Sequence, residues 1–337
     1  MKRRSVLHSA AMLPLLLSGG VESLLGKPKA AKAVERRTKQ RVRSSEPSWP
    51  TAPSWAKLKD DVGGNLIEVH PLFGSCERQS DGTGCLDAVK NAKNPYWIGD
   101  QAAGTEVSGW LDAWTPASSA YAIRARNAAD VAAGVNFART NNLRLVIKGG
   151  GHSYQGTSNA PDSLLIWTRA MNEVTLHDAF VGKGCAGREE PVPAVSAGAG
   201  AVWMDLYHAV TTQAARYVQG GGCATVGVAG LIQSGGFGWF SKAFGTAAAG
   251  LLEAEIVTAD GQVRVVNACI DPDLFWAIKG GGGGTFGVVT RVTLRTHKLP
   301  TFFGSAYGNI KAQSDGAFIQ LIARFITCRA SAISGLS

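Results

Sequence analysis

The stretch from Leu145 to Gly156, L-V-I-K-G-G-G-H-S-Y-Q-G, joins a hydrophobic run to three glycines, a histidine and two hydroxyl side chains. A short β-branched run that ends in consecutive glycines predicts a strand leading into a tight loop. Because glycines lack a Cβ atom, main-chain N–H groups in such a loop can close around an anion. His152 lies in this loop, so its imidazole is available to whatever the loop holds. From these residues alone, an ordinary exposed loop histidine is the alternative.

A second glycine-rich stretch runs from Gly220 to Gly238 and reads G-G-G-C-A-T-V-G-V-A-G-L-I-Q-S-G-G-F-G. Cys223 follows three glycines and precedes Thr225, so its sulfur also lies on a loop with few side chains around it. Two such loops, each with a reactive side chain and a nearby hydroxyl, indicate that His152 and Cys223 reach one flat, phosphate-bearing cofactor.

The motifs G-G-G-H-S-Y-x-G, G-G-x-C-x-T-V-G-V-x-G and x-G-G-F-G resemble the FAD-binding domain of the p-cresol methylhydroxylase and vanillyl-alcohol oxidase type. Within that type they resemble the berberine-bridge-enzyme-like oxidases. In that family the histidine bonds the flavin 8α-methyl group and the cysteine bonds flavin C6, which implies these roles for His152 and Cys223. The resemblance implies an FAD site formed by Gly149, Gly150, Gly151, His152, Ser153, Gly156, Gly222, Cys223, Thr225, Val226, Gly227, Gly230, Gly235, Gly236, Phe237, Gly238 and Ile256.

The resemblance also implies an α+β fold with a two-subdomain FAD-binding domain of the p-cresol-methylhydroxylase type over residues 114–299. An incomplete antiparallel-sheet substrate domain is expected to begin in residues 300–337. Residues 34–113 are expected to form an N-terminal arm and a loop-rich segment without clear periodicity. The resemblance ends near Phe325, so a C-terminal truncation is expected.

Local patterns support this organisation. A strand from Tyr121, a helix capped by Asn127 and a strand from Leu143 to Lys148 predict a β-α-β unit. Asp260-Gly261 predicts a hairpin turn between two strands. Further elements are predicted as strands at 164–167, 194–200, 253–259, 262–266, 288–296 and 302–310, and as helices at 202–218, 271–278 and 312–325.

Gly282, Gly284 and Gly287 match the spacing G-x-G-x-x-G of dinucleotide-binding folds. That fingerprint requires a strand before the glycines and a helix after them. Here a helix pattern comes first and a β-branched strand follows, so these glycines indicate a close backbone approach within the flavin domain. A helix stop with a flexible turn is the alternative.

The net charge of +9 resides at the start of the chain. Residues 1–43 hold 11 of the 34 Lys and Arg residues and 2 of the 25 Asp and Glu residues, so the remainder is neutral. This distribution argues against a nucleic-acid partner.

The start of the chain resembles a twin-arginine export signal over residues 1–33, with a general secretory signal as the alternative. It contains the twin arginines Arg3-Arg4, an apolar run from Ala10 to Leu17 and the sequence Ala31-Lys32-Ala33. The apolar run is too short to span a bilayer, so we expect export to the periplasm or the extracellular space and no stable membrane span.

The six cysteines suit an oxidising compartment. With Cys223 assigned to flavin and Cys328 in the irregular tail, four remain that allow two disulfides. Cys76 with Cys85 is the favoured pair, because Asp81-Gly82-Thr83-Gly84 permits a tight loop. No C-x-x-C motif or histidine cluster with metal-ligand spacing is found, so no metal site is predicted.

The expected chemistry is oxidation of a C–H bond that carries a hydroxyl or amine, with molecular oxygen as acceptor and a carbohydrate or bulky alcohol as substrate. Val226 matches the family position that lines the approach of oxygen, although a core valine is the alternative. Tyr154, Tyr207 and Tyr217 do not stand out as a catalytic base by their spacing, and the base remains unassigned. Two departures from the family are Ala224 after the cysteine and Ala248-Ala249-Gly250 in place of Ala-Asp-Asn. A flavin-binding but inactive module is the alternative function.

Overall fold

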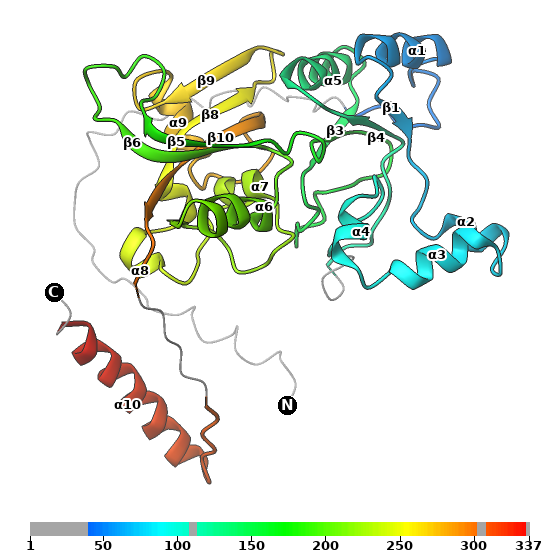
Figure 1. The fold of residues 1–337 in the computed structure, drawn as a ribbon. Helices are drawn as coiled ribbons and strands as arrows, with labels where there is room; N and C mark the ends of the chain where they lie inside the picture. The colour runs from blue at the N-terminus through cyan, green and yellow to red at the C-terminus, as the bar shows by residue number, and fades with distance from the viewer. Residues whose placement is uncertain (1–39, 108–112, 302–307, 335–337) are drawn as a thin grey trace, which may run out of the picture. The chain divides into compact units, whose positions relative to one another are not determined.

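The computed structural model describes residues 40–107, 113–301 and 308–334. It contains two β-sheets, each with helices packed against it (Figure 1). The expected leader, residues 1–33, lies outside the described residues.

The first sheet carries the histidine loop. Its four strands lie in the order β1-β2-β4-β3. They are β1 (Leu66–Glu68), β2 (Tyr121–Arg124), β3 (Arg144–Lys148) and β4 (Ser163–Trp167). Strands β2, β4 and β3 run parallel, and β1 pairs antiparallel with β2. Helix α5 (Ala128–Thr140) connects β2 to β3, and the Asn127 side chain caps it by accepting the Asp130 N–H at 3.0 Å. The predicted β-α-β unit is confirmed.

Part of the segment before residue 114 is built into the first sheet. Helix α1 (Ala52–Asp61) places Trp55 against Tyr121 of β2, with ring centroids 4.1 Å apart. Strand β1 adds directly to β2, and residues from Arg41 onward belong to one compact unit. The segment is also helical rather than loop-rich, since α2 (Gly74–Arg78), α3 (Thr83–Asn91) and α4 (Pro95–Gly99) follow. These helices are short, which explains why no helical periodicity was visible.

The second sheet carries the cysteine loop and is antiparallel. Its path is β5-β6-β10-β8-β9, with β7 pairing to β10. The strands are β5 (Val174–Phe180), β6 (Val192–Gly198), β7 (Arg216–Val218), β8 (Leu251–Val257), β9 (Val263–Asn267) and β10 (Val288–Lys298). The β8–β9 hairpin predicted from Asp260-Gly261 is confirmed. Apolar side chains from these strands and from α6 (Trp203–Tyr207), α7 (Val228–Gln233) and α9 (Pro272–Ile278) form the largest core cluster.

The helix predicted over 202–218 is wrong in its last five residues, 214–218, which are not helical. Helix α6 continues as a π-helix, η1 (His208–Gln213), which then stops. Ala215 has a φ of 52°, in the left-handed region that ends a helix. Residues 216–218 then pair with Thr296 to Lys298 of β10 as strand β7. This pairing with a distant strand outweighs the local helical pattern.

The favoured pair is confirmed, and the other two of the four cysteines form the second disulfide. Cys76 is bonded to Cys85, and Cys185 is bonded to Cys269 across 84 positions of sequence. The second bond ties the loop after β5 to the segment after β9. Cys185, Cys269 and Glu189 also lie within 4.8 Å of one another through their ligand atoms, but the two sulfurs are committed to the disulfide.

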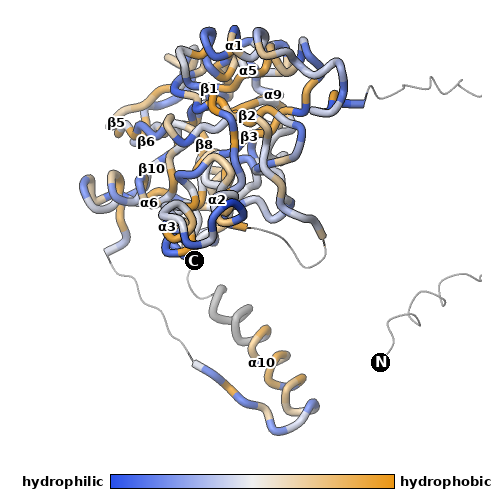
Figure 2. The backbone as a smooth tube through the Cα atoms, turned by 90° about the vertical axis from the view of Figure 1, so that its right-hand side faces the viewer, coloured by the Kyte–Doolittle hydropathy of each residue, from blue (hydrophilic) through white to orange (hydrophobic). Residues whose placement is uncertain are grey.

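The C-terminal helix is longer than expected. Helix α10 runs from Asp315 to Ser334 and continues beyond Phe325, because no proline or glycine occurs between Phe325 and Gly335. Phe318, Ile319 and Ile322 are exposed on it, and Figure 2 shows its hydrophobic character. Most of the expected strand at 302–310 lies outside the described residues, and residues 308–310 are not a strand. Within the described ranges, no helix is both long and apolar enough to cross a bilayer.

Two short elements complete the fold: α8 (Ser241–Phe244) and the 3₁₀ helix η2 (Ala247–Gly250).

Candidate functional site

The structure brings the two glycine loops into direct contact. The histidine loop, residues 149–156, follows β3, and the cysteine loop, residues 220–227, follows β7. A Cβ atom on Gly150 would lie 2.5 Å from the Thr225 carbonyl oxygen and 2.7 Å from the Gly227 nitrogen. Only glycine fits at this crossing, because both neighbours are backbone atoms.

His152 and Cys223 meet at the side chain of Thr225. The His152 Nε2 atom lies 2.9 Å from Thr225 Oγ1, and the Cys223 sulfur lies 3.9 Å from the same oxygen. Thr225 is buried, whereas Cys223 is an exposed free cysteine. The two side chains predicted to act on one cofactor therefore contact the same hydroxyl group.

Burial lowers the pKa of His152 below its ordinary value, and a hydrogen bond with the backbone of Thr225 opposes this shift in part. The imidazole is therefore held neutral at physiological pH. A neutral imidazole has a free lone pair on one ring nitrogen, which covalent bond formation requires.

Main-chain N–H groups of both loops are available to a ligand. Those of residues 150–152 and 222–225 donate to no acceptor among the described residues. Closely spaced N–H groups of this kind bind anions such as phosphate. The donors, the glycine crossing and the two nucleophilic side chains together fit a phosphate-bearing cofactor.

The far end of the histidine loop is closed by its own side chains and by Trp114. Ser153 Oγ lies 2.7 Å from Thr157 Oγ1 and accepts the Thr157 N–H at 3.2 Å. Gly156 has a φ of 71°, and a Cβ atom there would lie 2.6 Å from the Trp114 ring. Trp114 donates its indole N–H to the Tyr154 carbonyl at 2.8 Å. Ser153 and Gly156 thus shape the loop, and Trp114 acts as a packing anchor.

Residues 235–238 form a third loop that packs against the cysteine loop. A Cβ atom on Gly238 would lie 1.9 Å from the Gly220 carbonyl oxygen. Gly235 and Gly236 have φ values of 92° and 67°, and their carbonyls accept the N–H groups of residues 248 and 247. Ala248, in the Ala248-Ala249-Gly250 stretch that departs from the family pattern, therefore supports this loop through its backbone N–H. Phe237 is 83% exposed beside it.

Four further residues of the predicted FAD site lie in varied surroundings. Ile256 is completely buried in the core, and Gly230 is exposed on α7 with no atom within 4 Å of where its Cβ would lie. Val226 is partly buried against the same core, and its carbonyl accepts the Trp203 N–H at 3.1 Å. Gly222 is exposed, and its Cβ position lies near the indole nitrogen of Trp239.

The glycines at 280–287 make the close backbone approach that was predicted. The Gly282 N–H donates to the Gln233 carbonyl at 2.8 Å, and a Cβ atom on Gly280 would lie 3.4 Å from Gly235 Cα. A Cβ atom on Gly287 would lie 2.5 Å from the Val257 carbonyl oxygen. A strand, β10, follows them rather than a helix, so the dinucleotide fingerprint is excluded here.

The described tyrosines do not form an evident catalytic base. The Tyr207 hydroxyl donates to the Gly221 carbonyl at 2.5 Å, and burial raises its pKa. Tyr217 donates to the Gln219 side chain, and burial raises its pKa as well. Tyr154 is 66% exposed. Tyr207 instead supports the backbone of the cysteine loop.

Sequence reasoning missed Glu106 and Lys148, which both contact the histidine loop or its approach. The Glu106 N–H donates to the Gly151 carbonyl at 3.0 Å, and its buried Oε1 atom has no partner among the described residues. Burial raises the pKa of Glu106 to about 7. Lys148 ends β3 and is 1% exposed. A lysine closing a buried hydrophobic run was the one signal that could have identified it.

These features define a flavin-binding domain, and comparison with known proteins agrees. Residues 119–267 match the model of the FAD binding domain family. The FAD-linked oxidoreductase malF of Malbranchea aurantiaca is 35% identical over 281 residues, which cover 77% of this chain and 47% of the relative. The VAO-type flavoprotein oxidase VAO615 of Thermothelomyces thermophilus is 32% identical, over 85% of this chain and 52% of the relative.

Among solved structures, the VAO-type flavoprotein MtVAO615 from Myceliophthora thermophila C1 is similar with a TM-score of 0.67. It is 30% identical, and the match covers 77% of this chain and 49% of that one. The chain therefore carries an FAD-binding domain, and it is similar to FAD-linked oxidoreductases and VAO-type flavoproteins. It spans about half the length of the curated relatives it matches.

Proposed function

We propose that the chain binds FAD covalently through both His152 and Cys223 and serves an oxidase that acts on a CH–OH group of a carbohydrate or bulky alcohol. The supporting observation is that both side chains contact the hydroxyl of Thr225, at 2.9 Å and 3.9 Å. One flat ligand can bond to both nucleophiles only where they lie close together, as these two side chains do through their shared contact with Thr225.

The chain's residues suit this attachment. The Thr225 hydroxyl occupies Nε2 of His152, which leaves Nδ1 as the nitrogen available for a covalent bond. The exposed Cys223 sulfur is accessible from outside the loop. The N–H groups of residues 150–152 and 222–225 can receive the cofactor's phosphates. When bound, FAD supplies the acceptor for a hydride taken from the substrate carbon.

Two attachment points hold a ring without a protein lid over it, which suits bulky substrates. The oxidase assignment, with oxygen as the second substrate and hydrogen peroxide as the product, is supported by the relative named a VAO-type flavoprotein oxidase. Val226, three residues after the cysteine, is the proposed residue beside the path of oxygen.

The attachment is tested by mass spectrometry of flavin peptides from the wild type, Cys223→Ala and His152→Ala. We expect both peptides to carry flavin in the wild type, and each single variant to retain flavin at the other residue. Leu86→Ala, an exposed change on α3 outside the glycine loops, is the control and should retain both bonds. Protein that releases all its flavin on acid precipitation would refute covalent attachment.

A second candidate is a flavin-binding module without catalytic activity. It is favoured by the engagement of Tyr207 and Tyr217 in structural hydrogen bonds, which leaves neither of them evident as a catalytic base. Peroxide formation with a panel of sugars and alcohols separates the two: attached flavin without turnover on any of them supports the inactive module.

Export to the periplasm or the extracellular space is also proposed, on the strength of Arg3-Arg4 and the short apolar run after them. Replacing both arginines with lysine should retain the protein in the cytoplasm if the twin-arginine route is used. Continued export of this variant would favour the general secretory route.

A further inference from the structure

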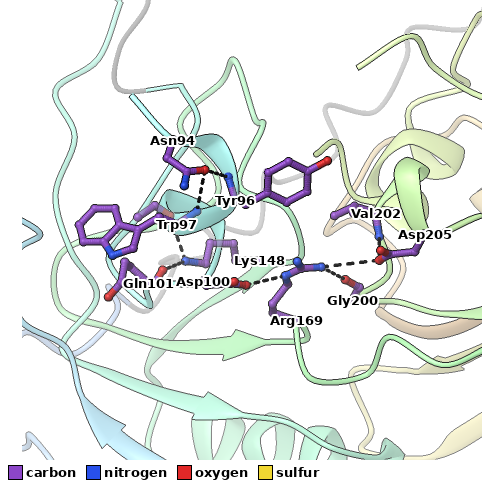
Figure 3. A network of polar contacts seen from close by, with 11 residues as sticks. Asn94, Tyr96, Trp97, Asp100, Gln101, Lys148, Arg169, Gly200, Val202 and Asp205 are labelled. Atoms are coloured by element: carbon purple, nitrogen blue, oxygen red, sulfur yellow. Dashed lines mark hydrogen bonds and ion pairs between the residues drawn. The ribbon is translucent and has the colours of Figure 1, made fainter. Parts of the chain in front are cut away.

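Lys148 connects the histidine loop to a segment that precedes it by more than 40 residues. Its ammonium nitrogen donates to the carbonyls of Gln101, Ala102 and Gly104 at 2.6, 2.6 and 2.9 Å (Figure 3). It also lies 5.0 Å from the centre of the Trp167 ring. An ammonium group has three N–H donors and no acceptor, so three carbonyls satisfy it completely.

The same segment contacts the histidine loop a second time. Glu106 donates its N–H to the Gly151 carbonyl at 3.0 Å, and a Cβ atom on Gly151 would lie 3.4 Å from Gly104 O. Because Lys148 immediately precedes Gly149, the loop is attached at its start and at its third glycine. We call residues 94–106, which include helix α4 and the segment after it, the brace.

The brace also reaches the second sheet through Arg169. Arg169 donates from Nε to Asp100 at 2.9 Å and from a terminal nitrogen to the Gly200 carbonyl at 3.2 Å. That terminal nitrogen lies 3.8 Å from Asp205, as Figure 3 shows. Asp205 in turn accepts the Val202 N–H at 3.1 Å, at the start of α6.

The start of α6 holds the backbone of the cysteine loop. Trp203 donates its N–H to the Val226 carbonyl at 3.1 Å, and Met204 donates to the Ala224 carbonyl at 3.0 Å. These bonds lie on both sides of Thr225. A continuous set of polar contacts therefore runs from the histidine loop through Lys148, the brace and Arg169 to the cysteine loop.

We propose that Lys148 and Arg169 are positioning residues that hold the histidine loop and the cysteine loop at the spacing His152 and Cys223 need to reach one flavin. This proposal rests on the proposed two-point attachment. Lys148 locates the histidine loop relative to the brace, and Arg169 locates the cysteine loop relative to the same brace.

The exposure of the acidic partners separates this role from general stabilisation. The side chains of Asp100 and Asp205 are 56% and 38% exposed, and ion pairs this open to solvent contribute little to folding. Because Arg169 itself is 18% exposed and also binds the Gly200 carbonyl, a purely stabilising role would lower the free energy of unfolding of Arg169→Met but leave the ratio of the two flavin bonds unchanged. A positioning role changes which of the two flavin bonds forms.

The test compares Arg169→Met with a matched control, Arg216→Met. Arg216 also bonds one carbonyl, that of His177 at 3.1 Å, and one exposed carboxylate, that of Asp178 at 2.6 Å, but it joins β7 to β5 outside the brace. For each purified, folded protein, the flavin on the Cys223 peptide is measured as a ratio to that on the His152 peptide. We expect this ratio to fall at least fivefold in Arg169→Met and to stay within twofold of the wild type in the control.

Lys148 is tested with Lys148→Met and the milder Lys148→Arg, because loss of a buried ammonium group can prevent folding. Lys148→Arg keeps the charge but changes the donor geometry, so we expect folded protein with reduced flavin on His152. Unchanged flavin ratios in both Arg169→Met and Lys148→Arg would overturn the proposal.

Hydrogen exchange of the flavin-free proteins gives an independent readout. We expect Arg169→Met, and not Arg216→Met, to exchange faster in peptides covering 149–156 and 222–227. If the wild type carries no covalent flavin, the proposed function fails, but faster exchange in both peptides still supports the brace. Equal exchange in the wild type and Arg169→Met would refute the brace whether or not flavin is attached.

Discussion

Replacing Gly150 with alanine tests the crossing on which the site depends. The added methyl would lie 2.5 Å from the Thr225 carbonyl oxygen and 2.7 Å from the Gly227 nitrogen, against an ordinary contact distance of at least 3.4 Å. Gly150 is not among the glycines with positive φ, so the overlap is the only perturbation. Both neighbours are backbone atoms and cannot rotate away, so the two loops must separate.

Overpacking of this kind costs about 1–3 kcal/mol. In a domain of this size each kcal/mol lowers Tm by about 2–4 °C. The free energy of unfolding is measured by denaturant titration, with Tm followed by near-ultraviolet circular dichroism. The flavin attached to Cys223 should fall together with stability, because the methyl moves the cysteine loop away from His152.

Gly283→Ala is the matched control, since Gly283 also lies in a glycine run, is exposed and has no atom within 4 Å of its Cβ position. Its free energy of unfolding should remain within about 0.5 kcal/mol of the wild type. If Gly150→Ala were as stable as this control, the two loops would not cross as described.

Two further predictions concern protonation. Glu106 has its pKa raised to about 7 from 4.5 by burial, so the folded state retains a proton that the unfolded state has lost between these values. The free energy of unfolding should therefore fall as pH rises from 4.5 to 7. Glu106→Gln should lack this fall, and at pH 8 its free energy of unfolding should exceed that of the wild type by about 1 kcal/mol, after discounting for solvent screening. Denaturant titrations at pH 5 and 8 measure both effects. Burial lowers the pKa of His152, so a proton NMR titration should give this imidazole a midpoint below its ordinary 6.5, both in the wild type and in Thr225→Val, which keeps the backbone group that opposes the shift; a midpoint of 6.5 or above in the wild type would contradict the burial of the ring.

Local sequence determined much of the scaffold around the site. Asn127 caps the helix between β2 and β3, and Asp260-Gly261 turns the chain between β8 and β9, because these features depend on neighbours within a few residues. The two glycine loops were recognisable because a tight backbone approach excludes side chains. The pair Cys76–Cys85 followed from a short separation of 9.

Long-range contacts decided the rest. The pairing of β7 with β10 replaced a predicted helical turn, because a strand partner 80 residues away supplies hydrogen bonds that no local pattern reports. The docking of β1 and α1 brought a segment expected to be separate into the first sheet, since apolar side chains such as Trp55 need a partner surface.

The features of the site also fall into those that local sequence determined and those that long-range contacts decided. The identities of His152 and Cys223 were legible in sequence, because each stands among glycines that local geometry requires. Their meeting at Thr225, and the connection of both loops to Lys148 and Arg169, arise from the packing of two sheets. A buried lysine is tolerated only where three carbonyls converge on it, and that convergence exists only in the folded chain.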